Sequence, residues 1–259
     1  QLLPIFDRQS IALIGAFSEK PRFQGSGSSQ VRPTKVDTLK NALAEYTDSV
    51  VYAPGYDPVH SEQDHALIEE AVAAAGEADV AVVFAGLPGI YESEGFDREH
   101  MRLPSQHDEL IRAVAATNAK TIVVLANGAP VEMPWLTEVG AVLEAYLGGQ
   151  AAGGGIADIL MGRSNPCGKL AETFAEQLSD IPAQRYFPGE NRQIQYREGL
   201  YIGYRYFDTA RRSVLFPFGH GLSYTRFEIS EAKLSGDTLT PKGSVFLKVQ
   251  IKNHPVLWT

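Results

Sequence analysis

The first 160 residues alternate between short apolar runs and helical patterns, and this alternation constrains the fold more than any other feature of the sequence. The apolar runs predict strands at Ile11–Ile14, Val50–Tyr52, Val80–Ala85, Thr121–Ala126 and Ala141–Tyr146. The third run is apolar at every position, which is typical of a strand covered on both faces of a parallel sheet. Strand–helix–strand repetition with short links predicts an α/β fold, a three-layer sandwich with a mostly parallel, doubly wound sheet.

Helical periodicity lies between the predicted strands. Apolar or small side chains recur at i, i+4 and i+7 in two segments: Ile68, Val72 and Ala75, and Leu110, Val114 and Thr117. We expect Ser105 to cap the second helix, with Asp108 three residues later. A third helix, rich in Ala and Gly, is predicted within Ala151–Met161.

The pattern changes at about residue 162, where prolines and aromatic residues replace the alternation. This stretch predicts a long irregular segment that wraps over the rest of the fold. Near the end, Tyr224–Ile229 and Val245–Ile251 alternate with period 2, as in a half-buried antiparallel sheet with a turn near Asp237. Two or three strands are too few for an independent β-sandwich. We therefore expect an α/β domain over residues 1–222 and a truncated β module over residues 223–259.

Composition excludes several classes of protein. The 259 residues carry 23 basic against 31 acidic side chains, a net charge of −8, which argues against a nucleic-acid backbone as the main partner. No apolar run approaches the roughly 20 residues needed to span a membrane. A single cysteine, Cys167, excludes a disulfide framework and fits a reducing compartment, so we expect a cytoplasmic protein, with secretion as the alternative. The first residue, Gln1, has no leader, and we expect a processed product or an excised piece.

Two polar loops follow predicted strands, and ligands of open parallel sheets bind at the carboxyl ends of strands. The Gly/Ser loop, Phe23–Ser29, follows the first strand, and the Glu loop, Tyr91–Arg98, follows the third. Because strands from the two halves of the alternation can lie side by side, these loops could face one another. Each loop also has a simpler interpretation: a flexible surface turn for the first and a solvated acidic loop for the second.

The Glu loop carries the residue types of acid/base chemistry. A glutamate there could act as a general acid if apolar neighbours such as Phe96 raise its pKa, while Asp97 and Arg98 could instead organise the loop by pairing with other groups. Glycoside hydrolysis ordinarily needs two carboxyl groups, so one glutamate is not enough. The six histidines are scattered, so we expect no metal site, and no phosphate-loop motif is present. No cofactor is expected.

An ordered series of motifs covering about residues 8 to 230 resembles the C-terminal half of a glycoside hydrolase family 3 β-glucosidase. The matching stretches are Ile11–Gly15, Gly25–Ser29, Glu92–Arg98 with Leu103 and Pro104, Asn127–Val131, Glu144–Gln150, Asn165–Leu170 with Thr173 and Phe174, Glu198–Arg205 and Phe216–Tyr224. The resemblance implies an N-terminal (β/α)₈ barrel, absent here, then this α/β sandwich and the start of a fibronectin type III-like module.

The resemblance also implies a mechanism. In such enzymes the barrel supplies an aspartate nucleophile and the sandwich domain lends a glutamate as acid/base. The matching glutamate directly precedes Gly95 and is Glu94, with Glu92 as the backup. Phe96 matches an aromatic position that could line the aglycone side, and Ser28 of the Gly/Ser loop is expected to reach the same cleft.

We therefore expect a retaining β-glucosidase whose substrate-binding residues here are Ser28, Phe96, Asp97 and Arg98. Its partners would be a β-glucoside or small oligosaccharide, the barrel of the same parent chain and, through an uncovered apolar face, a second copy. The fragment alone is expected to be inactive. The alternative is a non-catalytic α/β module that binds a sugar or a partner.

Overall fold

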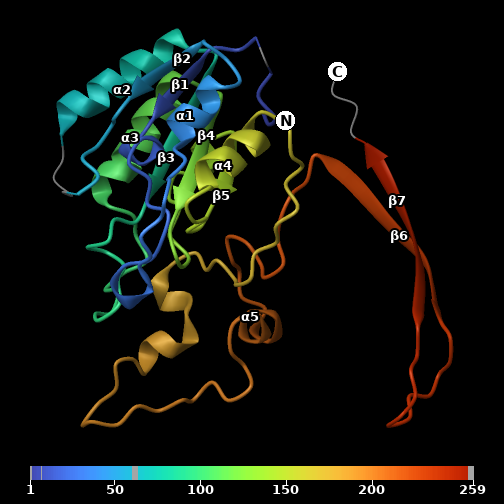
Figure 1. Ribbon diagram of the computed structural model, residues 1–259. Coiled ribbons are helices and arrows are strands. Elements are labelled where there is room, and N and C mark those ends of the chain that lie inside the picture. The colour runs from blue at the N-terminus through green and yellow to red at the C-terminus, as the bar shows by residue number, and fades with distance from the viewer. Residues whose placement is uncertain (1, 7, 60–63, 256–259) are drawn as a thin grey trace. The chain divides into compact units, whose positions relative to one another are not determined.

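The computed structural model describes residues 2–6, 8–59 and 64–255, and Figure 1 shows its helices and strands. The strands are β1 (Ile11–Ile14), β2 (Val50–Ala53), β3 (Val80–Gly86), β4 (Thr121–Ala126), β5 (Ala141–Glu144), β6 (Thr225–Leu234) and β7 (Leu247–Pro255). The α-helices are α1 (Leu39–Ala44), α2 (His65–Glu77), α3 (Ser105–Thr117), α4 (Ala152–Leu160) and α5 (Tyr204–Ala210). Short 3₁₀ helices are η1 (Ala16–Ser18), η2 (Gly27–Ser29), η3 (Leu136–Glu138), η4 (Leu178–Asp180) and η5 (Pro182–Arg185). The chain forms two compact units, one of residues 1–164 and 169–220, the other of residues 165–168 and 221–259.

The first unit is built on a five-stranded sheet with the order β2-β1-β3-β4-β5, and all neighbouring strands are parallel. This confirms the predicted parallel α/β fold, and the five strands lie where the apolar runs predict them. Every residue of β1, β3 and β4 is buried, as continuous apolar runs predict for strands covered on both faces. Since β1 lies beside β3, the chain reverses direction of winding between them, and both carboxyl ends reach one edge of the sheet.

Helices cover both faces of this sheet (Figure 1). The pair α2 and α3 packs on one face, and the pair α1 and α4 on the other, which gives the predicted three layers. Local sequence fixes the helix starts. The side chain of Thr38 accepts a hydrogen bond from the N–H of Asn41 at the start of α1, and Asp64 caps α2 in the same way.

The predicted cap of α3 is wrong. Ser105 is the first helical residue rather than the capping residue, and Pro104 occupies the cap with no side-chain hydrogen bond. Proline has an extended backbone here, and its carbonyl oxygen accepts from the N–H of His107 at 2.9 Å. Asp108, expected to support the cap, instead accepts a hydrogen bond from Trp135 Nε1 at 2.8 Å.

The segment after residue 162 is irregular, as its prolines and aromatic residues predict. It contains η4, η5 and α5, and it is tied back to itself by an isolated bridge between Phe174 and Phe216. Both of these aromatic residues pack against the sheet core. The stretch from Phe187 to Tyr204 presents several large apolar side chains to solvent: Phe187, Ile194, Tyr196, Leu200, Tyr201, Ile202 and Tyr204. We call this stretch the apolar strap.

The second unit contains the antiparallel pair β6 and β7, as the period-2 pattern predicts. The expectation that one face of this pair is half-buried is wrong, since Phe227 and Ile229 of β6 are 54% and 68% exposed. Two strands supply no second layer to cover an apolar face, so alternation alone cannot bury it.

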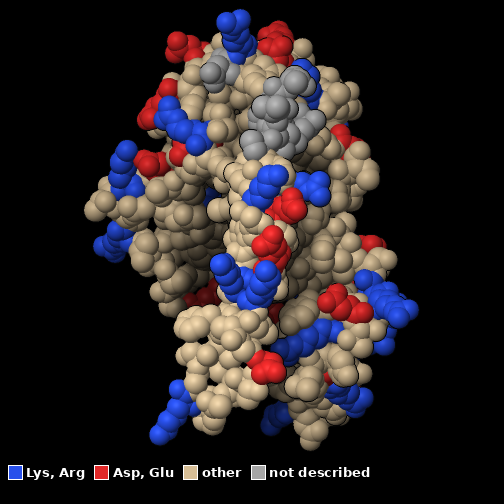
Figure 2. All heavy atoms as spheres, turned by 90° about the vertical axis from the view of Figure 1, so that its right-hand side faces the viewer, with Lys and Arg blue, Asp and Glu red and all other residues tan. Residues whose placement is uncertain are grey.

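Charged side chains of both signs are interspersed over the face of the molecule shown in Figure 2.

Within the residues that the structure describes, no helix has the length and apolar character needed to cross a membrane.

Candidate active site

The Gly/Ser loop and the Glu loop meet at the carboxyl edge of the sheet, which is one of the arrangements that the sequence left open. The backbone N–H of Ser28 donates to Glu94 Oε2 at 2.5 Å. This contact follows from topology: β1 pairs with β3, so the loops that leave their carboxyl ends are neighbours although they are far apart in sequence.

The Gly/Ser loop is a closed turn. The side chain of Gln24 accepts from the N–H of Val31 at 3.0 Å and donates to its carbonyl oxygen at 3.2 Å. Inside the turn Gly27 has φ +86°, and a Cβ there would lie 2.5 Å from Glu94 Cβ and 2.6 Å from Glu94 Oε2. Glycine is therefore needed at this position for its conformation and for the close approach of Glu94.

Glu94 is exposed, and its carboxylate oxygen is held by Ser28. The hydrogen bonds from Ser28 lower the pKa of Glu94 below its ordinary value. Elevation of this pKa by Phe96, the condition for a general acid in the sequence analysis, is not found, because Phe96 is itself 50% exposed and provides little desolvation. In this chain Glu94 is thus a carboxylate at neutral pH.

Glu92, the backup acid/base residue, has a different environment. Its Oε2 accepts from the N–H of Gly128 at 2.8 Å and lies 3.8 Å from Nη2 of Arg22. Its side chain is 17% exposed. Glu92 therefore joins the Glu loop to the loop after β4, whereas the Glu94 side chain faces solvent.

Phe96, Asp97 and Arg98 line one pocket of about 260 Å³. The other residues around it are Leu87, Ile90, Tyr91, Glu99, His100 and Arg102. Arg98 Nη1 donates to the carbonyl oxygen of Pro130 at 3.2 Å, and burial lowers the pKa of the guanidinium. Glu94 and Ser28 are not among the lining residues, so the expected site residues form two groups, a Ser28–Glu94 pair and this pocket.

Sequence reasoning missed a third carboxyl group at the same edge. Glu144 is the last residue of β5 and accepts hydrogen bonds from the N–H of Tyr146 at 2.9 Å and from Asn127 Nδ2 at 3.2 Å. Burial raises the pKa of Glu144 to about 8, and the negative charges of Glu172 and Glu92 act in the same direction. The sequence feature that could have identified Glu144 is its position as an acidic residue at the end of an apolar strand.

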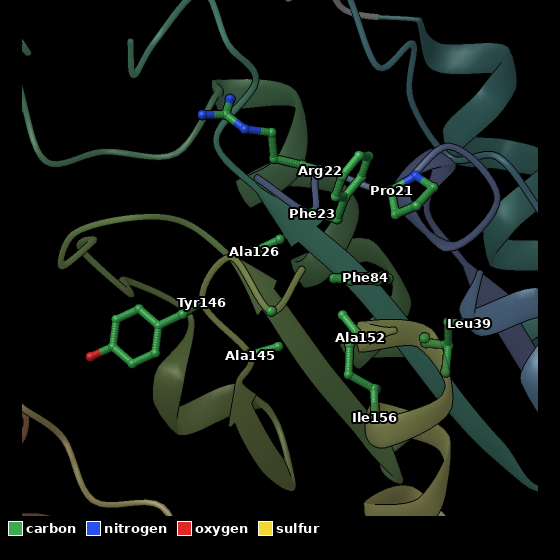
Figure 3. A pocket seen from close by; sticks show the side chains of 12 residues that line it. Pro21, Arg22, Phe23, Leu39, Phe84, Ala126, Ala145, Tyr146, Ala152 and Ile156 are labelled. Carbon is green, nitrogen blue, oxygen red and sulfur yellow. The ribbon is translucent and has the colours of Figure 1, made fainter. Parts of the chain in front are cut away.

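A second pocket lies at the same end of the sheet, between the ends of β3 and β4 and helix α4 (Figure 3). Phe84, Ala126, Ala152 and Ile156 are among its apolar lining. Its volume of about 10 Å³ is comparable to a single water and too small for a sugar.

Among residues 2–6, 8–59 and 64–255, no cluster of three or more His, Cys, Asp or Glu side chains is arranged to hold a metal ion.

Comparisons with known proteins relate the chain to glycosidases. The family model described as "Glycosyl hydrolase family 3 C-terminal domain" matches residues 1–224. Thermostable beta-glucosidase B of Acetivibrio thermocellus is 51% identical over 255 residues, which cover 97% of this chain and 34% of that protein. Exo-alpha-(1->6)-L-arabinopyranosidase of Bifidobacterium longum is 42% identical over 241 residues, covering 92% of this chain and 32% of that protein.

A solved structure, the GH3 beta-glucosidase of Bifidobacterium adolescentis, superposes with a TM-score of 0.90 at 40% identity and covers 97% of this chain and 37% of that one. The chain thus spans about a third of the length of these relatives.

Proposed function

Because the chain belongs to glycoside hydrolase family 3, as its C-terminal domain, we propose that it supplies the acid/base glutamate, Glu94, to a retaining β-glucosidase. The observation that carries this proposal is the Ser28–Glu94 pair at the carboxyl edge of the sheet, where an exposed carboxylate faces solvent. The relatives are longer chains, and the aspartate nucleophile would come from an N-terminal (β/α)₈ barrel of the same parent.

Glu94 would act twice in one turnover. Its protonated form gives a proton to the leaving glycosidic oxygen while the aspartate attacks the anomeric carbon. Its carboxylate then removes a proton from the water that hydrolyses the glycosyl-enzyme. This double displacement requires the two carboxyl groups to lie about 5–5.5 Å apart.

The lowered pKa of Glu94 suits the second of these steps and not the first. A general acid must carry its proton at the working pH, and a nearby carboxylate and exclusion of water both raise the pKa of a carboxyl group. The barrel would provide both through its aspartate and its surface. This reasoning supports the proposal that the chain alone is inactive.

The pocket at Phe96, Asp97 and Arg98 would take the leaving-group side of the substrate. The pocket joins an aromatic ring, which can pack against a sugar or an aryl group, to charged side chains that can hydrogen-bond hydroxyls. Ser28, whose N–H holds Glu94, borders the reacting bond in this proposal. Two relatives are named for different activities, β-glucosidase and arabinopyranosidase, so the sugar itself would be selected mainly by residues outside this chain.

Aryl glycosides test the proposal in the full-length parent. Glu94→Gln should remove most activity towards β-glucosides with poor leaving groups, which need the proton, and much less towards those with good leaving groups. Glu92→Gln is the matched control, since it lies in the same loop and changes the same charge. Loss of activity with Glu92→Gln but not with Glu94→Gln would refute the assignment.

Aryl α-L-arabinopyranosides should be assayed beside the aryl β-glucosides. Turnover of any of these aryl glycosides by the isolated chain would contradict the proposal that the chain alone is inactive.

The apolar strap would be a surface on which the N-terminal part of the parent packs. Tyr196 and Leu200 are 87% and 77% exposed, and monomeric proteins rarely leave large apolar patches open. The partner would be that N-terminal part because relatives extend well beyond this chain.

The uncovered strap should then make the isolated chain self-associate at high concentration, and the Tyr196→Ser, Leu200→Ser double variant should sediment as a monomer. Leu239→Ser is the control, since Leu239 is 70% exposed and lies in the second unit. A monomeric wild-type chain would count against this partner surface.

The pair β6 and β7 would be the start of a fibronectin type III-like module, with residues 223–259 as its first part and residues 1–222 as the catalytic α/β domain.

A further inference from the structure

Arg22 lies directly before the Gly/Ser loop, and its side chain is only 10% exposed. Its guanidinium points away from Phe84 and Ala126 in the small pocket of Figure 3. It donates to three backbone carbonyl oxygens, each at 3.0 Å: Nε to Gln24, Nη1 to Leu87 and Nη2 to Glu92. One planar group thus binds the Gly/Ser loop, the segment that leaves β3 and the Glu loop.

This arrangement uses the fork geometry of arginine. The guanidinium presents its donors at fixed angles in one plane, so three carbonyl oxygens held by it are held relative to one another. A lysine ammonium of the same charge is a single point on a flexible stem and cannot reproduce this spacing. These three contacts therefore require the shape of the guanidinium, and a positive charge alone is not sufficient.

Glu92 connects these segments to a third loop, the one that follows β4. Its carbonyl oxygen accepts from Arg22, and its carboxylate accepts from the N–H of Gly128 after β4. A Cβ at Gly128 would lie 2.9 Å from Glu92 Oε1, so the glycine allows this approach. The loops after β1, β3 and β4 are consequently joined by the contacts of Arg22 and Glu92. Glu94 lies two residues after Glu92.

We propose that Arg22 is a positioning residue for Glu94: by fixing the Gly/Ser loop and the Glu loop at one separation, it places the N–H of Ser28 against the Glu94 carboxylate. The role of Arg22 in catalysis rests on the function proposed above for Glu94. The positioning of the Glu94 carboxylate by the N–H of Ser28 does not rest on that function, because it can be measured in this chain without any substrate.

Arg22 acts here through geometry rather than through its charge. The pKa of Glu94 is lowered by hydrogen bonds from Ser28 and raised slightly by burial, and the charge of Arg22 is instead directed at Glu92. Loss of the fork should release the Ser28 contact even when a positive charge remains at position 22.

The experiment is an NMR titration of the isolated chain, following the Glu94 side-chain carboxyl carbon and the Ser28 amide proton. In the wild type both should titrate with one midpoint below 4.5, the ordinary value, and Glu94→Gln should abolish the response of the Ser28 amide. In Arg22→Lys and Arg22→Gln we expect the midpoint of Glu94 to shift upward towards 4.5 and the Ser28 response to be lost.

Arg112→Lys is the matched control, since Arg112 also binds a carbonyl oxygen, that of Pro134, and a carboxylate, that of Glu138. It should leave both signals unchanged. Equal titrations of wild type and Arg22→Lys would overturn the proposal. Retention of the wild-type midpoint by Arg22→Lys together with its loss in Arg22→Gln would do so as well, because charge would then be sufficient.

A measurement on the wild type covers the case in which both variants fail to fold. The guanidinium N–H groups of Arg22 should give separate, slowly exchanging resonances, and a freely rotating guanidinium would refute these three contacts. Altered titration in the Arg22 variants, combined with full activity of Glu94→Gln in the parent, would leave the positioning role intact and refute only the proposed function.

Discussion

The N–H of Ser28 donates to the carboxylate of Glu94 across 66 positions of sequence. Neither residue is buried, so the contact depends on the two loops that carry them and not on a core. Those loops are fixed at the carboxyl edge of adjacent strands, β1 and β3, and are joined by Arg22. The properties of Glu94 are accordingly decided by loop placement.

Gly27→Ala should separate Ser28 from Glu94. The new Cβ would lie 2.5 Å from Glu94 Cβ, so the carboxylate must move, and the pKa of Glu94 should rise towards its ordinary value. NMR titration of the Glu94 carboxyl measures this change. Gly149→Ala is the control, because φ is +77° there and a Cβ meets nothing within 4 Å. Both variants should lose about 1–2 kcal/mol of stability to the left-handed backbone, but only Gly27→Ala should alter the titration. An unchanged midpoint would contradict the close packing at Gly27.

Glu144→Gln should stabilise the chain at alkaline pH. Burial raises the pKa of Glu144 from 4.5 to about 8, so between these values the folded state retains a proton that the unfolded state has lost. Stability of the wild type relative to the variant should therefore fall as pH rises through this window, by up to about 1.4 kcal/mol per pH unit.

Urea unfolding of both chains at pH 4.5, 6, 7 and 8 measures the effect of Glu144. Glu77→Gln, an exposed change on α2, controls for the general loss of a negative charge. A stability difference between wild type and Glu144→Gln that does not vary with pH would show that Glu144 ionises normally in the folded chain.

His107→Leu should cost less stability as the solution becomes acidic. His107 is buried, its Nδ1 accepts from the N–H of Gly86 at 3.3 Å, and its ring lies 3.9 Å from that of Tyr56. Loss of the acceptor should cost about 1–3 kcal/mol at pH 7.5.

Burial lowers the pKa of His107 from 6.5 to about 3, so below pH 6.5 the unfolded state binds a proton that the folded state refuses. The wild type should lose up to about 1.4 kcal/mol per pH unit, and the His107→Leu variant should not show this loss. Urea unfolding at pH 7.5, 6 and 5 should thus show the penalty of the variant shrinking. A constant penalty would mean that His107 accepts its proton while folded.

Tyr56→Phe should destabilise the chain by about 1–3 kcal/mol. The buried hydroxyl of Tyr56 donates to the carbonyl oxygen of Phe84 at 2.6 Å and accepts from the N–H of Phe17 at 3.2 Å. Its removal leaves both backbone groups without this partner in the core. Tyr201→Phe, at an exposed tyrosine, should change stability by less than about 0.5 kcal/mol in the same denaturant experiment. Equal effects of the two substitutions would refute the role of the buried hydroxyl.

Local pattern was sufficient for most of the fold. Apolar runs and helical periodicity place the five parallel strands and the helices α2, α3 and α4, since burial on one or both faces imposes a period on the sequence itself. The predicted cap at Ser105 is wrong because the neighbouring Pro104 occupies the capping position. The burial of β6 was overestimated because alternation records which side faces a core, but not whether a core is present.

The sequence by itself determined the five parallel strands, helices α2, α3 and α4, and the family, and it singled out Glu94 as the residue proposed for the acid/base role. Only the tertiary structure decided that Ser28 holds Glu94, that Arg22 binds three segments and that Glu144 is buried. The physical reason is that hydrogen bonds and desolvation depend on atoms brought together by the pairing of β1 with β3 and of β4 with β5. Ser28 and Glu94 are 66 positions apart, and Asn127 and Glu144 are 17 apart, so local sequence patterns carry no trace of these contacts.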